Sequence, residues 1–98
     1  MRQIIFAPSF GREAEDIGVY IEESFGDAAR WKFLKHLSDT CVRIAEIPGL
    51  GVTDHGYEIG SAGFVFDQNW IFFEYDDDNI HFLHIVDTQR HKPNVSLN

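Results

Sequence analysis

Two consecutive segments with the composition of β-strands constrain this fold more than any other part of the sequence. Trp70–Tyr75 and Ile80–Val86 are rich in aromatic and β-branched residues, and the polar residues Asp76–Asn79 between them are typical of a turn. The sequence therefore predicts a β-hairpin. Strict alternation would place residues 80, 82, 84 and 86 on one face and 81, 83 and 85 on the other. Both sets are largely apolar, so we expect other elements to cover the sheet.

The first candidate for that cover is a helix that follows Pro8. Ser9 is a candidate N-cap of this helix, and Gly26 is a candidate left-handed C-cap. Ile17, Ile21 and Phe25 recur every four residues, which is the spacing of an apolar stripe on one side of a helix. Acidic residues near its start suit the helix dipole.

A second helix is predicted to start at once, with Asp27 as its N-cap, and to end before Pro48 and Gly49. Two helices joined by almost no loop form an antiparallel hairpin. Basic side chains are expected to give the second helix a positive outer surface: Arg30, Lys32, Lys35 and Arg43. Its apolar residues fall at helical spacing: Leu34, Leu37, Cys41, Ile44 and Ala45.

Three further segments are candidate strands: Gln3–Ala7, Tyr57–Ile59 and Ala62–Phe66. We predict the order β-α-α-β-β-β, an α+β fold in which the N-terminal helical hairpin covers one face of an antiparallel sheet. A length of 98 residues suits a single domain over residues 1–98. Residues 87–98 contain few apolar side chains, and we expect a loose tail there.

The charge of the chain disfavours broad nucleic-acid binding. The formal net charge is −8, from 16 acidic and 8 basic residues, whereas phosphate binding needs clustered Lys and Arg. Beyond Ile47 the basic residues are Arg90 and Lys92, and acidic residues far outnumber them. We therefore expect a partner with a basic segment.

The chain contains one cysteine, Cys41, so it forms no internal disulfide and suits a reducing cytosol. Its position on an apolar stripe predicts a core residue and not a nucleophile. The apolar run Gln3–Ala7 is too short for a signal-peptide core or a membrane span, so we expect a cytoplasmic protein.

No metal or cofactor is expected. On a regular strand His81 and His84 would point to opposite faces and could not share one ion. Asp76–Asp78 lacks the spaced carboxylates, the turn glycine and the final Glu of an EF-hand, so we interpret it as a solvated turn.

Several stretches along most of the chain follow the pattern of one family. They are Ala7-Pro8-Ser9 after the first strand, an acidic first helix, a second helix that runs into Pro48-Gly49-Leu50-Gly51, and the closing hairpin, which ends in Phe82–Arg90. In these features the chain resembles the RelE/ParE superfamily of bacterial toxins, and more closely its ParE side. The Pro-Gly-Leu-Gly element after a long helix is the most specific of them.

The chain also departs from that pattern, mainly by losing basic residues. Asp87 stands where many relatives have His, and Gln89 stands where the first Arg of a pair often lies, so that Arg90 alone remains. Glu74 and Tyr75 replace a common Tyr-Arg pair. The usual positive surface of the family is thus largely missing.

The resemblance implies the toxin of a type II toxin-antitoxin pair, a class associated with plasmid stabilisation. ParE-like toxins with a known target bind and inhibit DNA gyrase, and they are neutralised by a ParD-like antitoxin whose C-terminal segment packs across the helical hairpin and sheet. DNA would then be contacted only through the antitoxin. The candidates for target binding are Arg90, His91, Lys92, Tyr75 and Glu74, and those for antitoxin binding are Trp31, Trp70 and Phe73. For Trp70 and Phe73, strand position favours packing in the core.

Two alternatives remain open. RelE-like relatives cleave messenger RNA on the ribosome, and here Arg90, Tyr75 and a histidine are the candidate groups. Such cleavage needs cations beside the phosphate as well as groups that move protons, and the strands and their ends offer a single cation, so we expect a binding protein and not an enzyme. The other alternative is a detoxified member retained as an interaction module.

Overall fold

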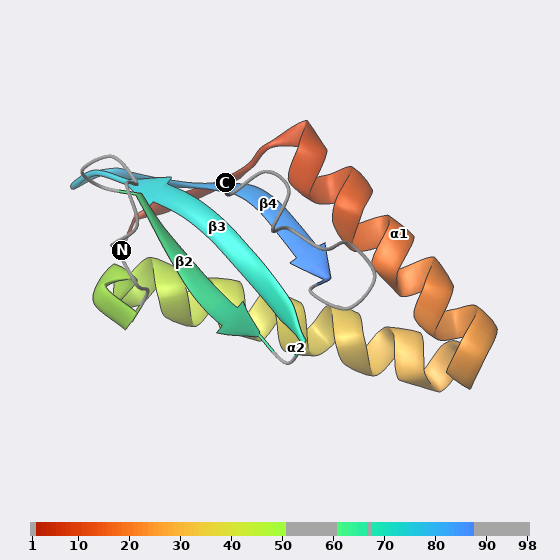
Figure 1. Cartoon of the computed structure of the whole chain (residues 1–98). Helices are drawn as coiled ribbons and strands as arrows, with labels where there is room; N and C mark the ends of the chain where they lie inside the picture. Colours follow the sequence, from red (N-terminus) through yellow and green to blue (C-terminus); the bar gives the residue numbers. More distant parts are fainter. Residues whose placement is uncertain (1, 51–60, 67, 88–98) are drawn as a thin grey trace.

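The computed structural model describes residues 2–50, 61–66 and 68–87. The elements are β1 (Gln3–Phe6), α1 (Pro8–Phe25), α2 (Asp27–Glu46), a short 3-10 helix (Pro48–Leu50), β2 (Ser61–Phe66), β3 (Asn69–Tyr75) and β4 (Asn79–Asp87). The α+β class and the order β-α-α-β-β-β are confirmed, with both helices on one side of a twisted sheet (Figure 1). The candidate strand Tyr57–Ile59 and the predicted tail beyond Asp87 lie outside the described residues.

The sheet has the strand order β1-β4-β3-β2. The predicted hairpin is confirmed, since β3 and β4 pair antiparallel, and β2 pairs antiparallel with β3. The prediction of an antiparallel sheet is wrong at one edge, because β1 lies parallel to β4 from Gln3↔Asn79 to Phe6↔Phe82. Parallel pairing needs a long crossover, and the two helices between these strands form part of one.

A β-bulge in β4 changes which side chains face the helices. Phe72 pairs with His84 and Phe73 with Phe82, so Leu83 is an extra residue without a partner in β3. The alternation predicted for residues 80–86 is therefore wrong from Leu83 onward. Ile85 is buried on the same side as Phe82, and His84 lies on the other side.

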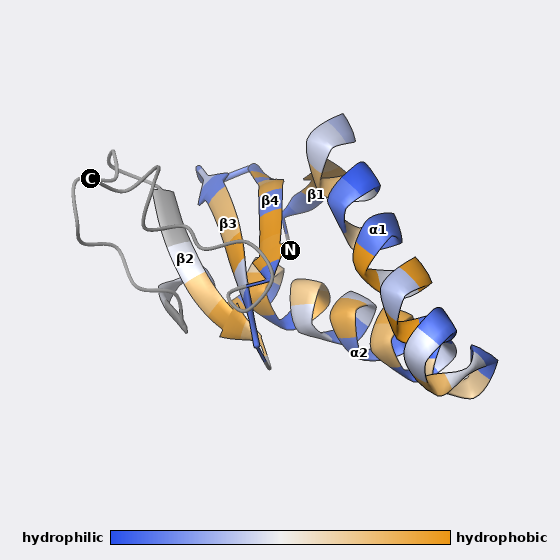
Figure 2. Ribbon diagram, turned by 45° about the vertical axis from the view of Figure 1, so that its right-hand side comes forward, coloured by the Kyte–Doolittle hydropathy of each residue, from blue (hydrophilic) through white to orange (hydrophobic). Residues whose placement is uncertain are grey.

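The hydrophobic core lies between the sheet and the helical hairpin. β3 and β4 are hydrophobic along most of their length (Figure 2). Side chains at most 2% exposed come from both central strands and from α2: Ile71, Phe73, Ile80, Phe82, Ile85, Ile44, Ala45 and Cys41. α1 contributes Phe10, Ala14 and Ile17. The predicted stripe of α1 holds at Ile17 but not at Phe25, which is 73% exposed because it lies at the tip of the hairpin.

The start of α1 completes the edge of β4 beyond the last residue of β1. α1 begins at Pro8, with Ala7 at its N-cap, so the prediction that Ser9 caps this helix is wrong. Instead, Ser9 Oγ donates to the carbonyl of Leu83 at 2.7 Å. Glu13 Oε1 accepts from the backbone N–H of Ile85 at 3.0 Å. Two side chains thus satisfy backbone groups that β1 is too short to reach.

The joint between the helices also differs in part from the prediction. Gly26 ends α1 at the predicted position with a φ of 96°, but its ψ of 174° is not that of the predicted left-handed cap. Its N–H donates to the carbonyl of Glu22. Asp27 is not the N-cap of α2, since Gly26 holds that position and no side-chain capping bond forms. The helices are linked instead by Arg30 and Glu22, whose Nη1 and Oε1 lie 2.5 Å apart. The side chain of Arg30 lies over Gly18 of α1, where a Cβ would be 3.4 Å from the Nε of Arg30.

The turn of the hairpin is held by Asp76. Its Oδ1 accepts from the backbone N–H groups of Asp78 and Asn79, both at 2.8 Å. These two hydrogen bonds lower the pKa of Asp76 below its ordinary value. The solvated turn predicted from sequence is thus an Asx-type turn that the aspartate itself organises.

We expect Ser9→Ala to lower the free energy of unfolding by about 1 kcal/mol, because it leaves the half-buried carbonyl of Leu83 without its donor. The measurement is urea unfolding followed by circular dichroism. The control is Ser38→Ala at an exposed position of α2, where we expect a change within about 0.5 kcal/mol. Equal effects of the two substitutions would show that the bond to Leu83 contributes nothing.

Candidate functional site

The sheet has one face turned away from the helices, which we call the open face. The registers place on it the side chains that alternate with the core residues: Val65, Trp70, Phe72, Glu74, His81, His84 and Val86. Trp70 and Phe72 stack with ring centroids 6.1 Å apart, over the backbone of Gly63. A Cβ at Gly63 would lie 3.2 Å from the Trp70 ring, so glycine is what permits this close approach.

The bulge brings the two histidines of β4 onto the open face together, so the expectation that they point to opposite faces is wrong. His81 lies opposite Glu74 in the register, and His84 lies opposite Phe72. His84 Nδ1 is 3.1 Å from Glu13 Oε2 of α1. Within residues 2–50, 61–66 and 68–87, no group of three or more His, Cys, Asp or Glu side chains is placed to hold a metal ion.

The described strands contribute no positively charged Lys or Arg side chain to the open face. None of the residues of β1, β2, β3 or β4 is Lys or Arg. Arg2 lies before β1, where its guanidinium carbon is 5.3 Å from the centre of the Tyr75 ring and its Nε donates to the carbonyl of Asp76 at 2.5 Å. Among the described residues of the strands, the groups on the open face that could take part in acid-base chemistry are Glu74, His81 and His84, and none of them is Lys or Arg.

The candidates for target binding do not form one described surface. Glu74 is exposed on the open face, whereas Tyr75 packs against the core from the side of the helices. Arg90, His91 and Lys92 lie outside the described residues.

The candidates for antitoxin binding are also spread over the molecule. Trp31 is 72% exposed on α2. Trp70 is half-buried on the open face, so the core position that its strand favoured is wrong. Phe73 is 1% exposed and belongs to the core. Its position in a strand had favoured this core position over antitoxin binding. The structure therefore places Trp31 and Trp70 at the surface, on different elements.

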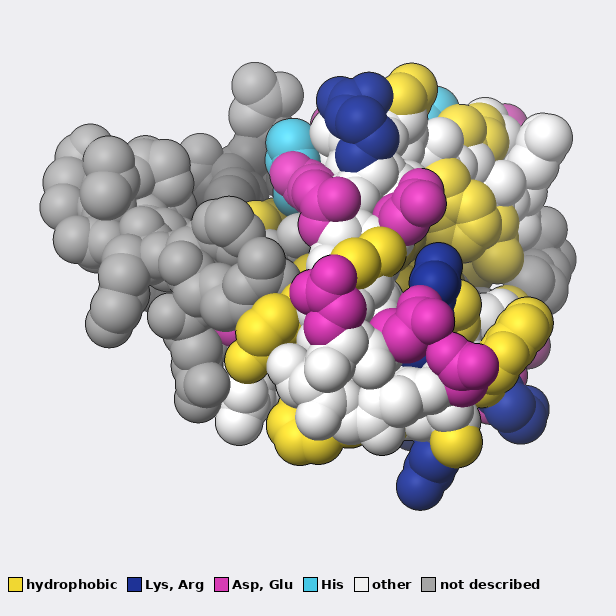
Figure 3. Space-filling model, turned by 90° about the vertical axis from the view of Figure 1, so that its right-hand side faces the viewer, with side chains coloured by type: hydrophobic (Ala, Val, Ile, Leu, Met, Phe, Trp, Pro, Cys, Tyr) yellow, Lys and Arg dark blue, Asp and Glu magenta, His cyan; other side chains and the backbone are white. Residues whose placement is uncertain are grey.

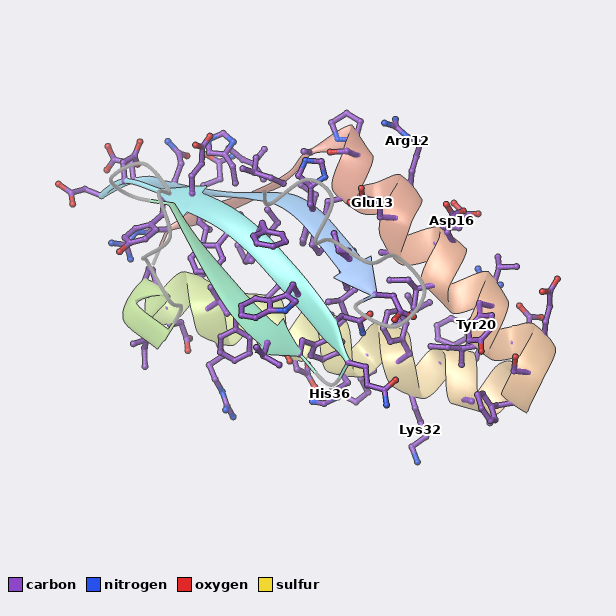
Figure 4. All side chains as sticks on the ribbon, in the orientation of Figure 1. Arg12, Glu13, Asp16, Tyr20, Lys32 and His36 are labelled. Atoms are coloured by element: carbon purple, nitrogen blue, oxygen red, sulfur yellow. The ribbon has the colours of Figure 1, made fainter. Side chains whose placement is uncertain are left out.

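Sequence analysis missed a groove between the end of the helical hairpin and the end of the sheet, which we call the tip groove. Its apolar walls are Ile17, Tyr20, Ile21 and Phe25 from α1 and Phe33 from α2. Gln68, Asn69 and Asp87 line it from the sheet. Tyr20 lies on the part of α1 that extends past β4 (Figure 4). Phe25 was the available signal, since it continues the apolar stripe of α1 beyond what the sheet can cover.

The two helices differ in the charge of their outer surfaces. Exposed acidic side chains gather along α1 (Figure 3): Glu15, Asp16 and Glu23. α2 carries exposed Lys32, Lys35 and Arg43, as the sequence predicts, and Lys35 Nζ is 3.3 Å from Asp39 Oδ2. The prediction is wrong for Arg30, which is half-buried against α1. Neither α1 nor α2 is long and apolar enough to cross a membrane.

Cys41 is a core residue, as predicted. It is 1% exposed, and burial raises the pKa of its thiol from an ordinary value of 9.0 to about 12. The thiol is therefore protonated at neutral pH, when only the thiolate is a good nucleophile.

Comparison with known proteins confirms the family resemblance. Residues 4–91 match the family described as ParE toxin of type II toxin-antitoxin system, parDE. No curated protein sequence matches the chain. A solved structure described as the chromosomal ParDE TA system from P. aeruginosa superposes with a TM-score of 0.74 and 11% identity, over 89% of this chain and 96% of that one.

The fold is also similar to two solved structures of the E. coli DinJ-YafQ toxin-antitoxin complex. Both superpose with a TM-score of 0.54, at 12% and 13% identity. They cover 90% and 91% of this chain, and 93% and 96% of their own chains. At such identities the structural likeness concerns the fold.

We expect Cys41 to resist iodoacetamide at pH 8 in the folded chain and to react once the chain is unfolded in urea, as followed by mass spectrometry. Because its folded pKa of about 12 lies above the unfolded value near 9, its contribution to stability is complete below pH 9 and is lost as the pH rises toward 12. Relative to Cys41→Ala, the wild type should therefore lose stability in that range. A parallel pH dependence of the two proteins would contradict this account.

Proposed function

The chain belongs to the family of ParE toxins of type II toxin-antitoxin systems, and from this premise we propose that it acts by binding DNA gyrase and inhibiting it. The inhibition is stoichiometric, by contact, and involves no chemical step. A cognate antitoxin neutralises the toxin by binding it. Any contact with operator DNA is made through the antitoxin.

The observation that supports a binding role over phosphodiester cleavage is the lack of Lys and Arg in all four strands. Cleavage of RNA builds negative charge on a phosphate, and enzymes stabilise that charge with cations or preorganised donors. The open face offers two histidines and the carboxylate Glu74, a poor set for this purpose. A protein that acts by contact has no such requirement.

An antitoxin partner is supported by charge and by the relatives. The net charge of −8 and the acidic outer surface of α1 suit a partner segment that carries Lys or Arg. The solved structures of similar fold are described as toxin-antitoxin systems or complexes. We propose that the antitoxin lays an amphipathic segment against the helical hairpin and the sheet of this chain.

Ribosome-dependent RNA cleavage is the second candidate, and one observation favours it. His84 contacts the carboxylate of Glu13, and the register sets His81 opposite Glu74, so that each histidine of the open face has a carboxylate nearby in the fold. Such groups can move protons during cleavage. A cation would have to come from outside the strands.

Expression of the chain alone in a bacterial host tests the proposal. We expect growth arrest with altered DNA supercoiling, relieved by Arg90→Ala if that residue contacts gyrase. The matched control is Arg43→Ala, which removes an exposed cation from the last turn of α2 and should leave toxicity unchanged. Plasmid topology and incorporation of labelled amino acids are followed in the same cultures.

The other results of that experiment each favour a different function. Protein synthesis that halts before supercoiling changes would contradict gyrase inhibition and favour RNA cleavage. A soluble, folded product that leaves growth unaffected but still binds an antitoxin would favour the detoxified interaction module.

A further inference from the structure

Asn69 is a buried polar residue with one side-chain acceptor that lacks a hydrogen-bond partner. It is 6% exposed, and its Oδ1 has no hydrogen-bond partner. Buried side-chain acceptors are nearly always satisfied, and an unsatisfied one destabilises the chain that carries it. An acceptor left in this state at the first residue of β3 calls for an explanation.

The position of Asn69 suggests an explanation, because this residue lines the tip groove. The groove is apolar on the side of the helices, and Tyr20 and Phe25 are 44% and 73% exposed there. Asp87, the cross-strand partner of Asn69, lines the same groove and adds a carboxylate. The apolar walls therefore meet an asparagine and an aspartate at the end of the sheet.

A cationic side chain on an apolar segment fits this combination. A Lys or Arg can donate to Asn69 Oδ1 and be attracted by Asp87, while its own methylene groups and its neighbours pack on Ile17, Ile21 and Phe25. A purely apolar segment would leave Oδ1 unsatisfied, and an acidic one would be repelled by Asp87. The net charge of −8 also favours a cationic segment over an apolar or an acidic one.

We propose that Asn69 is a recognition residue of the tip groove, and that its Oδ1 accepts a hydrogen bond from a Lys or Arg of the antitoxin segment. The identity of the partner rests on the proposed function, whereas the chemistry of the site rests on the groove alone. In the free chain Oδ1 is sealed from solvent. The proposal requires a rotation of the amide about χ2, a soft torsion in asparagine, that brings Oδ1 to the groove lined by this residue.

The site can be tested without an antitoxin. Butylguanidinium is titrated into the full chain, and the NMR signals of its labelled isoleucine methyl groups are recorded. We expect saturable shifts of the Ile17 and Ile21 methyl signals, and binding weaker by about tenfold or more in Asn69→Leu. Asn79→Leu, at the opposite end of the sheet, is the matched control and should bind as the wild type does. Equal affinity of wild type and Asn69→Leu, or no saturable shift, would overturn the proposal.

A stability measurement separates recognition from misfolding. Because Asn69→Leu removes an unsatisfied buried acceptor, we expect its melting temperature to equal or exceed that of the wild type. Asn69→Asp retains the acceptor and should retain binding of butylguanidinium, also where the leucine variant folds poorly. Loss of binding in Asn69→Asp as well, with the fold intact, would contradict the role of the acceptor.

The antitoxin itself provides the second test. Binding of the protein encoded next to this chain should weaken by about tenfold or more with Asn69→Leu, and replacing its contacting Lys or Arg by Met should show coupling to Asn69 in a double-mutant cycle. Unchanged affinity would overturn recognition of the antitoxin through Asn69. If no such protein binds the wild type, the proposed function fails, and the butylguanidinium titration still decides the site.

Discussion

The antiparallel pairing of β3 with β4 is the interaction on which the rest of the structure depends. These two strands hold most of the fully buried side chains of the sheet, and both helices pack on the face that they form. β2 attaches to the free side of β3, and β1 attaches to the free side of β4. Loss of this pairing would leave α1 and α2 without the apolar surface that makes their hairpin stable.

Within that pairing, the extra residue Leu83 determines what each face of β4 carries. It keeps Phe82 and Ile85 in the core and sends both His81 and His84 to the open face. At the same place β1 ends, opposite Phe82, and Ser9 and Glu13 of α1 satisfy two backbone groups of β4 beyond it. The start of the first helix therefore lies against the bulged part of β4.

The two candidate surfaces lie on opposite sides of the sheet and differ in character. The open face is aromatic and carries histidines and carboxylates, while the tip groove is apolar with an unsatisfied acceptor at its end. Because the two surfaces are separate, an antitoxin bound in the tip groove would not need to make the same contacts with the toxin as the target of the toxin does.

The sequence by itself determined the helices, the β3–β4 hairpin and the order of the elements. These features follow from local signals, such as the recurrence of apolar residues in α2, the turn residue Asp76 and the glycine at position 26. The family resemblance came from the same local stretches. Cys41 was also predicted correctly as a core residue, because an apolar stripe on a helix shows which side is buried.

Only the tertiary structure decided the parallel edge of β1, the common face of His81 and His84, and the burial of Asn69. Strand pairing joins residues far apart in sequence, and one inserted residue reverses every later side chain of a strand. Ser9 looked like a helix cap because its actual partner, Leu83, is distant in the chain. An unsatisfied acceptor is likewise invisible in sequence, since it is defined by which groups the fold brings near it and which it keeps away.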